Sequence, residues 1–273
     1  YKNQWQKLLP MLLYLRKFEF DVAIELEYKV ISRIIICLKI INPSCILSVS
    51  KGKGRYGMEP QAVKPYDYYT NPELKHQRDT CLDTLRLLNI NCQDKSYDVF
   101  YSEKNNSDAL SFLSLYRASE IIIGLNIEGS NDEKKISEED LIKIISGLRS
   151  KHNNITIILF HKPDDRDLII KLIPKEVSSY VFPSYPTKSL LDLAALIDNL
   201  DLIISPDTSI VHMACAFKKP LVAIYNKNIR LFQKWHPISD CNDVIFSDYE
   251  DSLKFIDVSE IINKTSKLIK KIK

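Results

Sequence analysis

One segment of the sequence, residues 202–220, carries acidic, hydroxyl and imidazole side chains at a spacing that could bind a phosphorylated ligand. It opens with an apolar run that predicts a buried strand, after which Asp207, Thr208 and Ser209 begin a short helix. His212 follows on that helix, so it can face the same cleft as Asp207. The first N–H groups of a helix are unpaired and lie at its positive dipole end, which favours anions. In open α/β sheets, ligands bind at the edge formed by the carboxyl ends of the strands, where such helices begin.

Each of these side chains also has a simpler interpretation. Asp207 could serve only as the N-cap of the helix, which is worth about 1 kcal/mol of stability. His212 could be a core histidine whose hydrogen bonds are satisfied inside the protein. The segment therefore has to be judged together with the elements around it.

Strands and helices alternate through the second half of the chain. The predicted strands are residues 121–125, 155–160, 180–182, 202–204, 221–225 and 244–246. The predicted helices are one that Ser137 caps, then residues 167–172, 189–200, the helix with His212, and 258–272. This alternation implies a parallel sheet covered by helices on both faces.

The pattern strand, D-T-S-x-x-H-x-A, helix, K-P, strand resembles the C-terminal signature of glycosyltransferase family 9. That family comprises the ADP-heptose:lipopolysaccharide heptosyltransferases and their relatives. The matching residues are Asp207, Thr208, His212, Ala214, Ala216 and Pro220, while Ser209 stands where the family usually has glycine. Residues 20–26, 190–197 and 235–237 resemble other motifs of the family, so the resemblance covers nearly the whole chain.

The resemblance implies an α/β protein with two Rossmann-like lobes of the GT-B type. Residues 1–117 would form an acceptor-side lobe and residues 118–273 a nucleotide-sugar-binding lobe, with the last helix able to pack back on the first lobe. The family's early strand and G-D loop, which carry its catalytic base, have no counterpart here. We therefore expect an incomplete N-terminal lobe. Either the sequence is a fragment, with the catalytic base in a segment before Tyr1, or this family member has lost that segment.

The resemblance also implies a reaction and its site. The reaction would be inverting, metal-independent transfer of a heptose or related sugar from a nucleotide-diphosphate donor, ADP-heptose in the family, to a lipopolysaccharide or lipooligosaccharide core, without a cofactor. Lys134 would neutralise the leaving diphosphate together with the N–H groups of Thr208 and Ser209. Asp207 and His212 would contact the donor sugar or its phosphates, and Asp165 falls near the family's ribose-binding acidic residue.

Other interpretations stay open. Lys134 could belong to a solvated charge run, and Asp165 could be a surface turn residue. A catalytically impaired nucleotide-sugar-binding paralogue, or a fragment of such an enzyme, is the alternative function.

The first half of the sequence is less informative. Lys53 and Arg55 lie in a basic, glycine-containing loop that fails the P-loop pattern, because no G-K-[ST] follows at the right spacing. The loop is either a solvated turn or an acceptor-side patch for anionic groups. Residues 31–41 could form a helix or a strand. Residues 102–108, SEKNNSD, are polar and rich in turn formers, so we expect the linker between the lobes from there to residue 119.

Composition limits the class of protein. At 273 residues the chain is long enough for two lobes, and its net charge of +3 gives no argument for nucleic acid. The six cysteines form no C-x-x-C pair, which favours reduced thiols and a cytoplasmic location. Lysines on the last helix either form a solvated face or attract it to the inner membrane surface, where a lipid-linked oligosaccharide acceptor would lie. A monomer is the default expectation.

Overall fold

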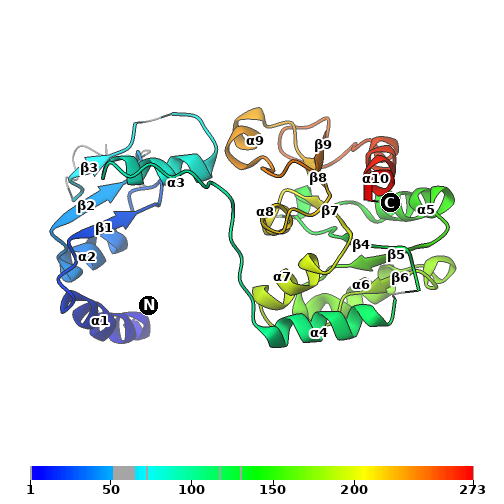
Figure 1. Cartoon of the computed structure of the whole chain (residues 1–273), viewed down its shortest axis with the longest axis horizontal. Coiled ribbons are helices and arrows are strands. Elements are labelled where there is room, and N and C mark those ends of the chain that lie inside the picture. Colours follow the sequence, from blue (N-terminus) through cyan, green and yellow to red (C-terminus); the bar gives the residue numbers. More distant parts are fainter. Residues whose placement is uncertain (1, 52–64, 72, 117, 130, 273) are drawn as a thin grey trace. The chain divides into compact units, whose positions relative to one another are not determined.

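The computed structural model describes residues 2–51, 65–71, 73–116, 118–129 and 131–272. The chain divides into two compact units, Tyr1–Lys95 and Ser96–Lys273. Each unit contains a parallel sheet with helices beside it (Figure 1). The α/β class expected from the sequence is confirmed.

The first unit has a three-stranded sheet in the order β1-β2-β3. Its elements are α1 (Lys2–Arg16), β1 (Val22–Glu25), α2 (Ser32–Ile41), β2 (Cys45–Ser48), β3 (Tyr68–Tyr69) and α3 (Gln77–Arg86). The ambiguous stretch at residues 31–41 is a helix, which ends at Asn42 in the left-handed conformation. Lys53 and Arg55 lie outside the described residues.

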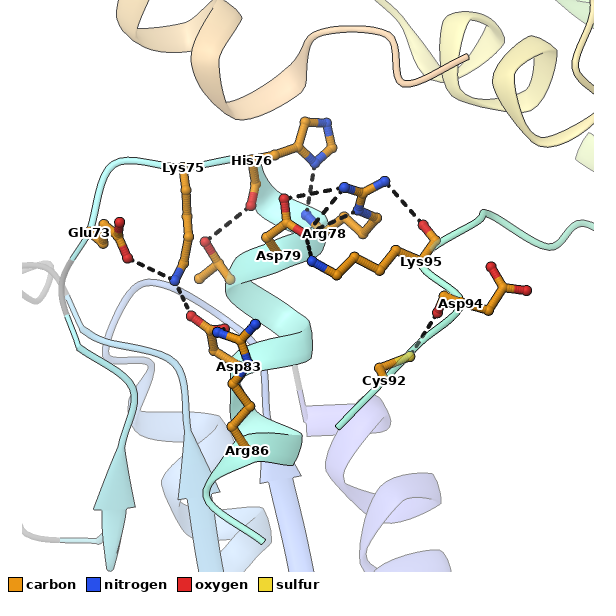
Figure 2. A network of polar contacts seen from close by, with 11 residues as sticks. Glu73, Lys75, His76, Arg78, Asp79, Asp83, Arg86, Cys92, Asp94 and Lys95 are labelled. Atoms are coloured by element: carbon orange, nitrogen blue, oxygen red, sulfur yellow. Dashed lines mark hydrogen bonds and ion pairs between the residues drawn. The ribbon is translucent and has the colours of Figure 1, made fainter. Parts of the chain in front are cut away.

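A polar network fixes the start of α3 (Figure 2). His76 is buried and caps the helix, because its Nδ1 accepts a hydrogen bond from the Arg78 amide at 3.1 Å. The Arg78 guanidinium donates to the carbonyl oxygen of Lys95 at 3.1 Å, and the Lys95 amine lies 3.5 Å from the Asp79 carboxylate. These contacts hold the end of the first unit against α3.

The second unit has a six-stranded, fully parallel sheet in the order β6-β5-β4-β7-β8-β9. The strands are β4 (Ile121–Leu125), β5 (Ile155–Leu159), β6 (Val181–Pro183), β7 (Leu202–Pro206), β8 (Leu221–Tyr225) and β9 (Asn242–Phe246). The helices are α4 (Glu103–Ser114), α5 (Glu138–Lys151), α6 (Arg166–Leu172), α7 (Leu190–Asp198), α8 (Ser209–Ala216), α9 (Ile229–Trp235) and α10 (Val258–Ile272). Every predicted strand of this half is present, whereas α4 and α9 were not predicted.

Helices cover both faces of this sheet because side chains of a strand alternate between its faces. In β4, Ile121 and Ile123 pack with α5, α6 and α10, while Ile122 packs with α4, α7, α8 and α9. The five residues of β4, β5, β7 and β8 are all buried, as expected for strands of a sheet covered on both sides. The sheet is thus a rigid support for the loops at its edge.

The prediction of a linker in the polar stretch at residues 102–108 is wrong, because these residues form the start of α4. Ser102 and Asn105 make a capping box at the helix N-terminus, and Leu113 is fully buried. Asn105 donates a hydrogen bond to Asp192 of α7 at 2.6 Å. The chain therefore divides at residues 95 and 96, before the boundary expected at residue 117, because α4 packs on α7 in the second unit.

The last helix has the docked face that its apolar pattern predicts. Ile261, Leu268 and Ile269 of α10 are at most 1% exposed and belong to the core that α5 shares. Lys267 and Lys270 are exposed on the outer side. In the part of the chain that the structure describes, no helix is both long and apolar enough to cross a membrane.

Candidate functional site

A cavity of about 560 Å³ lies at the carboxyl edge of the second sheet. From β4 the chain goes to β5 and β6 on one side and then returns to β7, β8 and β9 on the other. The strand order therefore reverses between β4 and β7, which is where α/β sheets bind ligands. The apolar side chains that line the cavity are Phe160, Pro163, Leu190, Leu193 and Ile210.

Thr208 and Ser209 line this cavity at the start of α8. Thr208 is the N-cap, since its side-chain oxygen accepts a hydrogen bond from the Ile210 amide at 3.3 Å. The interpretation of Asp207 as merely the N-cap is therefore wrong, because Asp207 precedes the capping residue. The positive end of α8 faces the edge at which the cavity opens.

Asn126, directly after β4, joins the two strands at the switch point. It is 3% exposed, and its side-chain amide donates to Ser205 Oγ at 3.1 Å and to Thr208 Oγ1 at 3.3 Å. Its Oδ1 accepts a hydrogen bond from the Glu128 amide at 3.1 Å. Sequence reasoning missed this residue, although a lone polar residue after a buried strand was an available signal.

Lys134 and Asp207 come together although they are far apart in the sequence. Burial raises the pKa of the Asp207 carboxyl, and the positive charge of Lys134 opposes that rise. The buried hydroxyl of Tyr225, at the end of β8, has its pKa raised by burial and by the nearby Asp207 charge. The site therefore holds a half-buried carboxylate beside a cation.

The loop before α5 holds Lys134 at this edge. Lys134 ends a short 3₁₀ helix, Asp132–Lys134, whose Glu133 carbonyl accepts a hydrogen bond from the Leu253 amide at 2.8 Å. A Cβ at Gly129 would lie 1.9 Å from the Lys134 carbonyl oxygen, so only glycine allows the two backbones to approach. Tertiary contacts thus fix a segment that the sequence presents as a charge run.

His212 lies on α8 between two aromatic rings. Its ring centroid is 5.8 Å from that of Tyr97 and 5.7 Å from that of Trp235. Burial lowers the pKa of the imidazole, which favours its neutral form. Among the described residues its buried Nδ1 has no hydrogen-bond partner, so His212 is not a satisfied core histidine.

Asp165 does not join this group. It ends a short 3₁₀ helix, Pro163–Asp165, and precedes α6 without a side-chain cap bond. Pro163 lines the cavity, whereas Asp165 is not part of its lining, and neither are Lys134, Asp207 and His212. The carboxylate in the cavity lining is Glu128. Within the described ranges, no three His, Cys, Asp or Glu side chains are arranged to hold a metal ion.

The raised pKa of Asp207 predicts a pH-dependent stability. A carboxyl whose pKa is higher in the folded state makes stability fall as the pH rises from the ordinary value of about 3.9 through the raised one. We therefore expect Asp207→Asn to be more stable than the wild type at neutral pH. The two proteins should be equally stable below a pH of about 3, where the Asp207 carboxyl is protonated in both the folded and the unfolded protein. Thermal unfolding at several pH values checks this, and equal midpoints at neutral pH would contradict it.

The covered parallel sheet with its switch-point cavity in the second unit, together with the parallel sheet of the first unit, defines a glycosyltransferase fold of the two-lobed GT-B type. The sequence profile of glycosyltransferase family 9 (heptosyltransferase) matches residues 13–262, so the chain belongs to this family. It is therefore a glycosyltransferase, as the resemblance in residues 202–220 predicted. No curated protein sequence matches the chain.

Solved structures share the fold. The E. coli ADP-heptose lps heptosyltransferase II is 16% identical, with a TM-score of 0.74, over 96% of this chain and 80% of that protein. A family 9 glycosyl transferase from Veillonella parvula is 18% identical, with a TM-score of 0.76, over 96% of this chain and 79% of that one. E. coli heptosyltransferase WaaC with ADP is 16% identical, with a TM-score of 0.65, over 97% and 81%.

Proposed function

We propose that the protein transfers a heptose or related sugar, with inversion, from a nucleoside diphosphate donor to a lipopolysaccharide or lipooligosaccharide core acceptor. The observation that carries this proposal is the grouping of Lys134, Asp207 and the α8 N-terminus beside the switch-point cavity. In such a transfer an acceptor hydroxyl attacks the anomeric carbon while the diphosphate leaves. The enzyme must deprotonate the acceptor and stabilise negative charge on the leaving group.

Lys134 and the start of α8 carry the second task in this proposal. Lysine is a compact positive charge suited to phosphate, and the N–H groups of Thr208 and Ser209 add fixed donors. Together they supply the positive charge that the leaving diphosphate needs without a metal cofactor. Asp207 accepts hydrogen bonds from the donor sugar hydroxyls, and neutral His212 contacts the sugar or a phosphate. Asp165, which the resemblance assigns to the ribose, also lies outside the cavity lining, and its role stays a prediction.

The cavity takes the nucleoside end of the donor. Its volume of about 560 Å³ and its apolar walls suit a flat base, and Thr208 and Ser209 at its edge lead to the phosphates. Two WaaC structures support an adenine nucleotide, since one is described with ADP and the other with ADP-2-deoxy-2-fluoro heptose. ADP-heptose is therefore the proposed donor.

A lipid-linked acceptor requires contact with a membrane surface. Lys267, Lys270 and Lys271 lie on the exposed side of α10 and are available to anionic lipids. Each lysine near such a surface adds about 1 kcal/mol of attraction. A cytoplasmic protein resting on the inner membrane surface fits this proposal.

A nucleotide panel tests the donor site. Thermal unfolding would be measured in the presence of ADP, GDP, UDP, CDP or ADP-heptose. A second assay would measure the release of ADP from ADP-heptose when a lipooligosaccharide core acceptor is added. We expect ADP and ADP-heptose to stabilise the protein most, by about 2.7 kcal/mol at a hundred times the dissociation constant. Stabilisation by no nucleotide would refute the proposal. Stabilisation without acceptor-dependent ADP release would favour the alternative, a nucleotide-sugar-binding protein without turnover.

A further inference from the structure

The rim of the cavity carries an ion pair that the proposed function does not use. Lys162 follows β5 and Glu128 follows β4, and the Lys162 amine lies 3.2 Å from Glu128 Oε2. Both side chains line the cavity together with Thr208 and Ser209. A carboxylate therefore stands in the same cavity as the helix start that favours anions.

Glu128 has a second cation. The amine of Lys135 lies 3.3 Å from the same Oε2 atom and 3.1 Å from Asp132 Oδ1. Hydrogen bonds from Lys135 to Asp132 and Glu128 raise the pKa of this lysine, so it stays charged. The Glu128 backbone is held by Asn126, which accepts from its amide and donates to its carbonyl at 2.9 Å. Glu128 is thus fixed and remains neutralised if Lys162 leaves.

Lys162 is free to exchange partners. Its side chain is 63% exposed, whereas Glu128 is 20% exposed. Exposed ion pairs of this kind contribute little to stability, so breaking one has a small cost. A diphosphate offers several oxygens and more than one negative charge, and it competes strongly for an ammonium group.

We infer that Glu128 holds Lys162 at the cavity rim in the free protein, and that Lys162 moves to the phosphates when a nucleoside diphosphate binds. This inference rests on the proposed donor site. Lys162 thereby adds a second phosphate-binding lysine to Lys134, supplied from β5 instead of the loop before α5. Glu128 stays paired with Lys135 and acts as a competitor that the ligand must displace.

The inference predicts effects of opposite sign for the two partners. Lys162→Ala removes a charge that contacts phosphate, so it should weaken binding of ADP. Glu128→Gln removes the competitor and a negative charge from the cavity, so it should strengthen that binding. An ion pair that only ties the two loops together would respond in the same direction to both substitutions, because either one breaks it.

Calorimetric titration of the full chain at low salt, with ADP and with adenosine, decides between these roles. We expect Lys162→Ala to weaken ADP about fivefold, as loss of one solvent-exposed charge contact would do, and to leave adenosine unchanged. Glu128→Gln should bind ADP more tightly than the wild type does, by about twofold or more. The control pair Lys143→Ala and Glu139→Gln breaks an exposed ion pair on α5 and should change neither ligand.

Two results would overturn the inference. In the first, both cavity variants shift ADP affinity in the same direction. In the second, Lys162→Ala weakens adenosine as much as ADP, which would assign the effect to the shape of the cavity. Glu128→Ala repeats the test if the glutamine variant unfolds at a lower temperature. Absence of ADP binding by the wild type would instead refute the proposed function, and this inference with it.

Discussion

Lys134→Ala should weaken the binding of ADP by roughly tenfold to 150-fold, which corresponds to about 1.5–3 kcal/mol for a lost charge-assisted contact. The physical reason is the position of Lys134 beside half-buried Asp207, where its charge is only partly screened by water. Calorimetric titration of both proteins with ADP measures the effect. This is the largest change that we expect from one side chain in the donor site.

The control for this prediction is Lys143→Ala, which removes the same charge from an exposed position on α5. That variant should bind ADP as the wild type does. Thermal unfolding without nucleotide shows whether Lys134→Ala changes the fold. Unaltered ADP affinity in a folded Lys134→Ala protein would remove this lysine from the site and weaken the proposed function.

Leu268→Ala should destabilise the second unit by about 2–5 kcal/mol, the usual cost of a large-to-small change in a packed core. Leu268 is 1% exposed and belongs to the core cluster that α10 shares with α5 and the sheet. The cost arises from lost contacts and from the cavity left behind. Unfolding by urea, followed by circular dichroism, gives the difference in free energy of unfolding.

Lys270→Ala is the matched change on the exposed side of the same helix, and it should alter stability by no more than about 0.5 kcal/mol. Equal stabilities of the Leu268 and Lys270 variants would mean that α10 is not docked. The comparison also bears on membrane association, because a docked apolar face leaves the exposed side of α10, with its lysines, to meet a lipid surface.

Local patterns were sufficient for most elements of the second unit. The apolar spacing of residues 258–272 predicted α10 with the bounds that the structure has, and Ser137 caps α5 as expected. The polar composition of residues 102–108 misled us because hydrogen bonds of Ser102 and Asn105 stabilise a helix start there. The buried side of α4 appears only later, at Ala109 and Leu113, so a short window did not reveal it.

The site divides in the same way. The sequence by itself determined that Asp207, Thr208 and His212 follow a buried strand at a helix start, because spacing along one short segment fixes that arrangement. The resemblance predicted Lys134 in the same site, and in the structure its charge lies near Asp207. Only the tertiary structure decided that Asn126 bridges to Thr208 and that Tyr97 and Trp235 lie beside His212. Those neighbours come from distant parts of the chain, and the packing of strands and helices determines which of them meet.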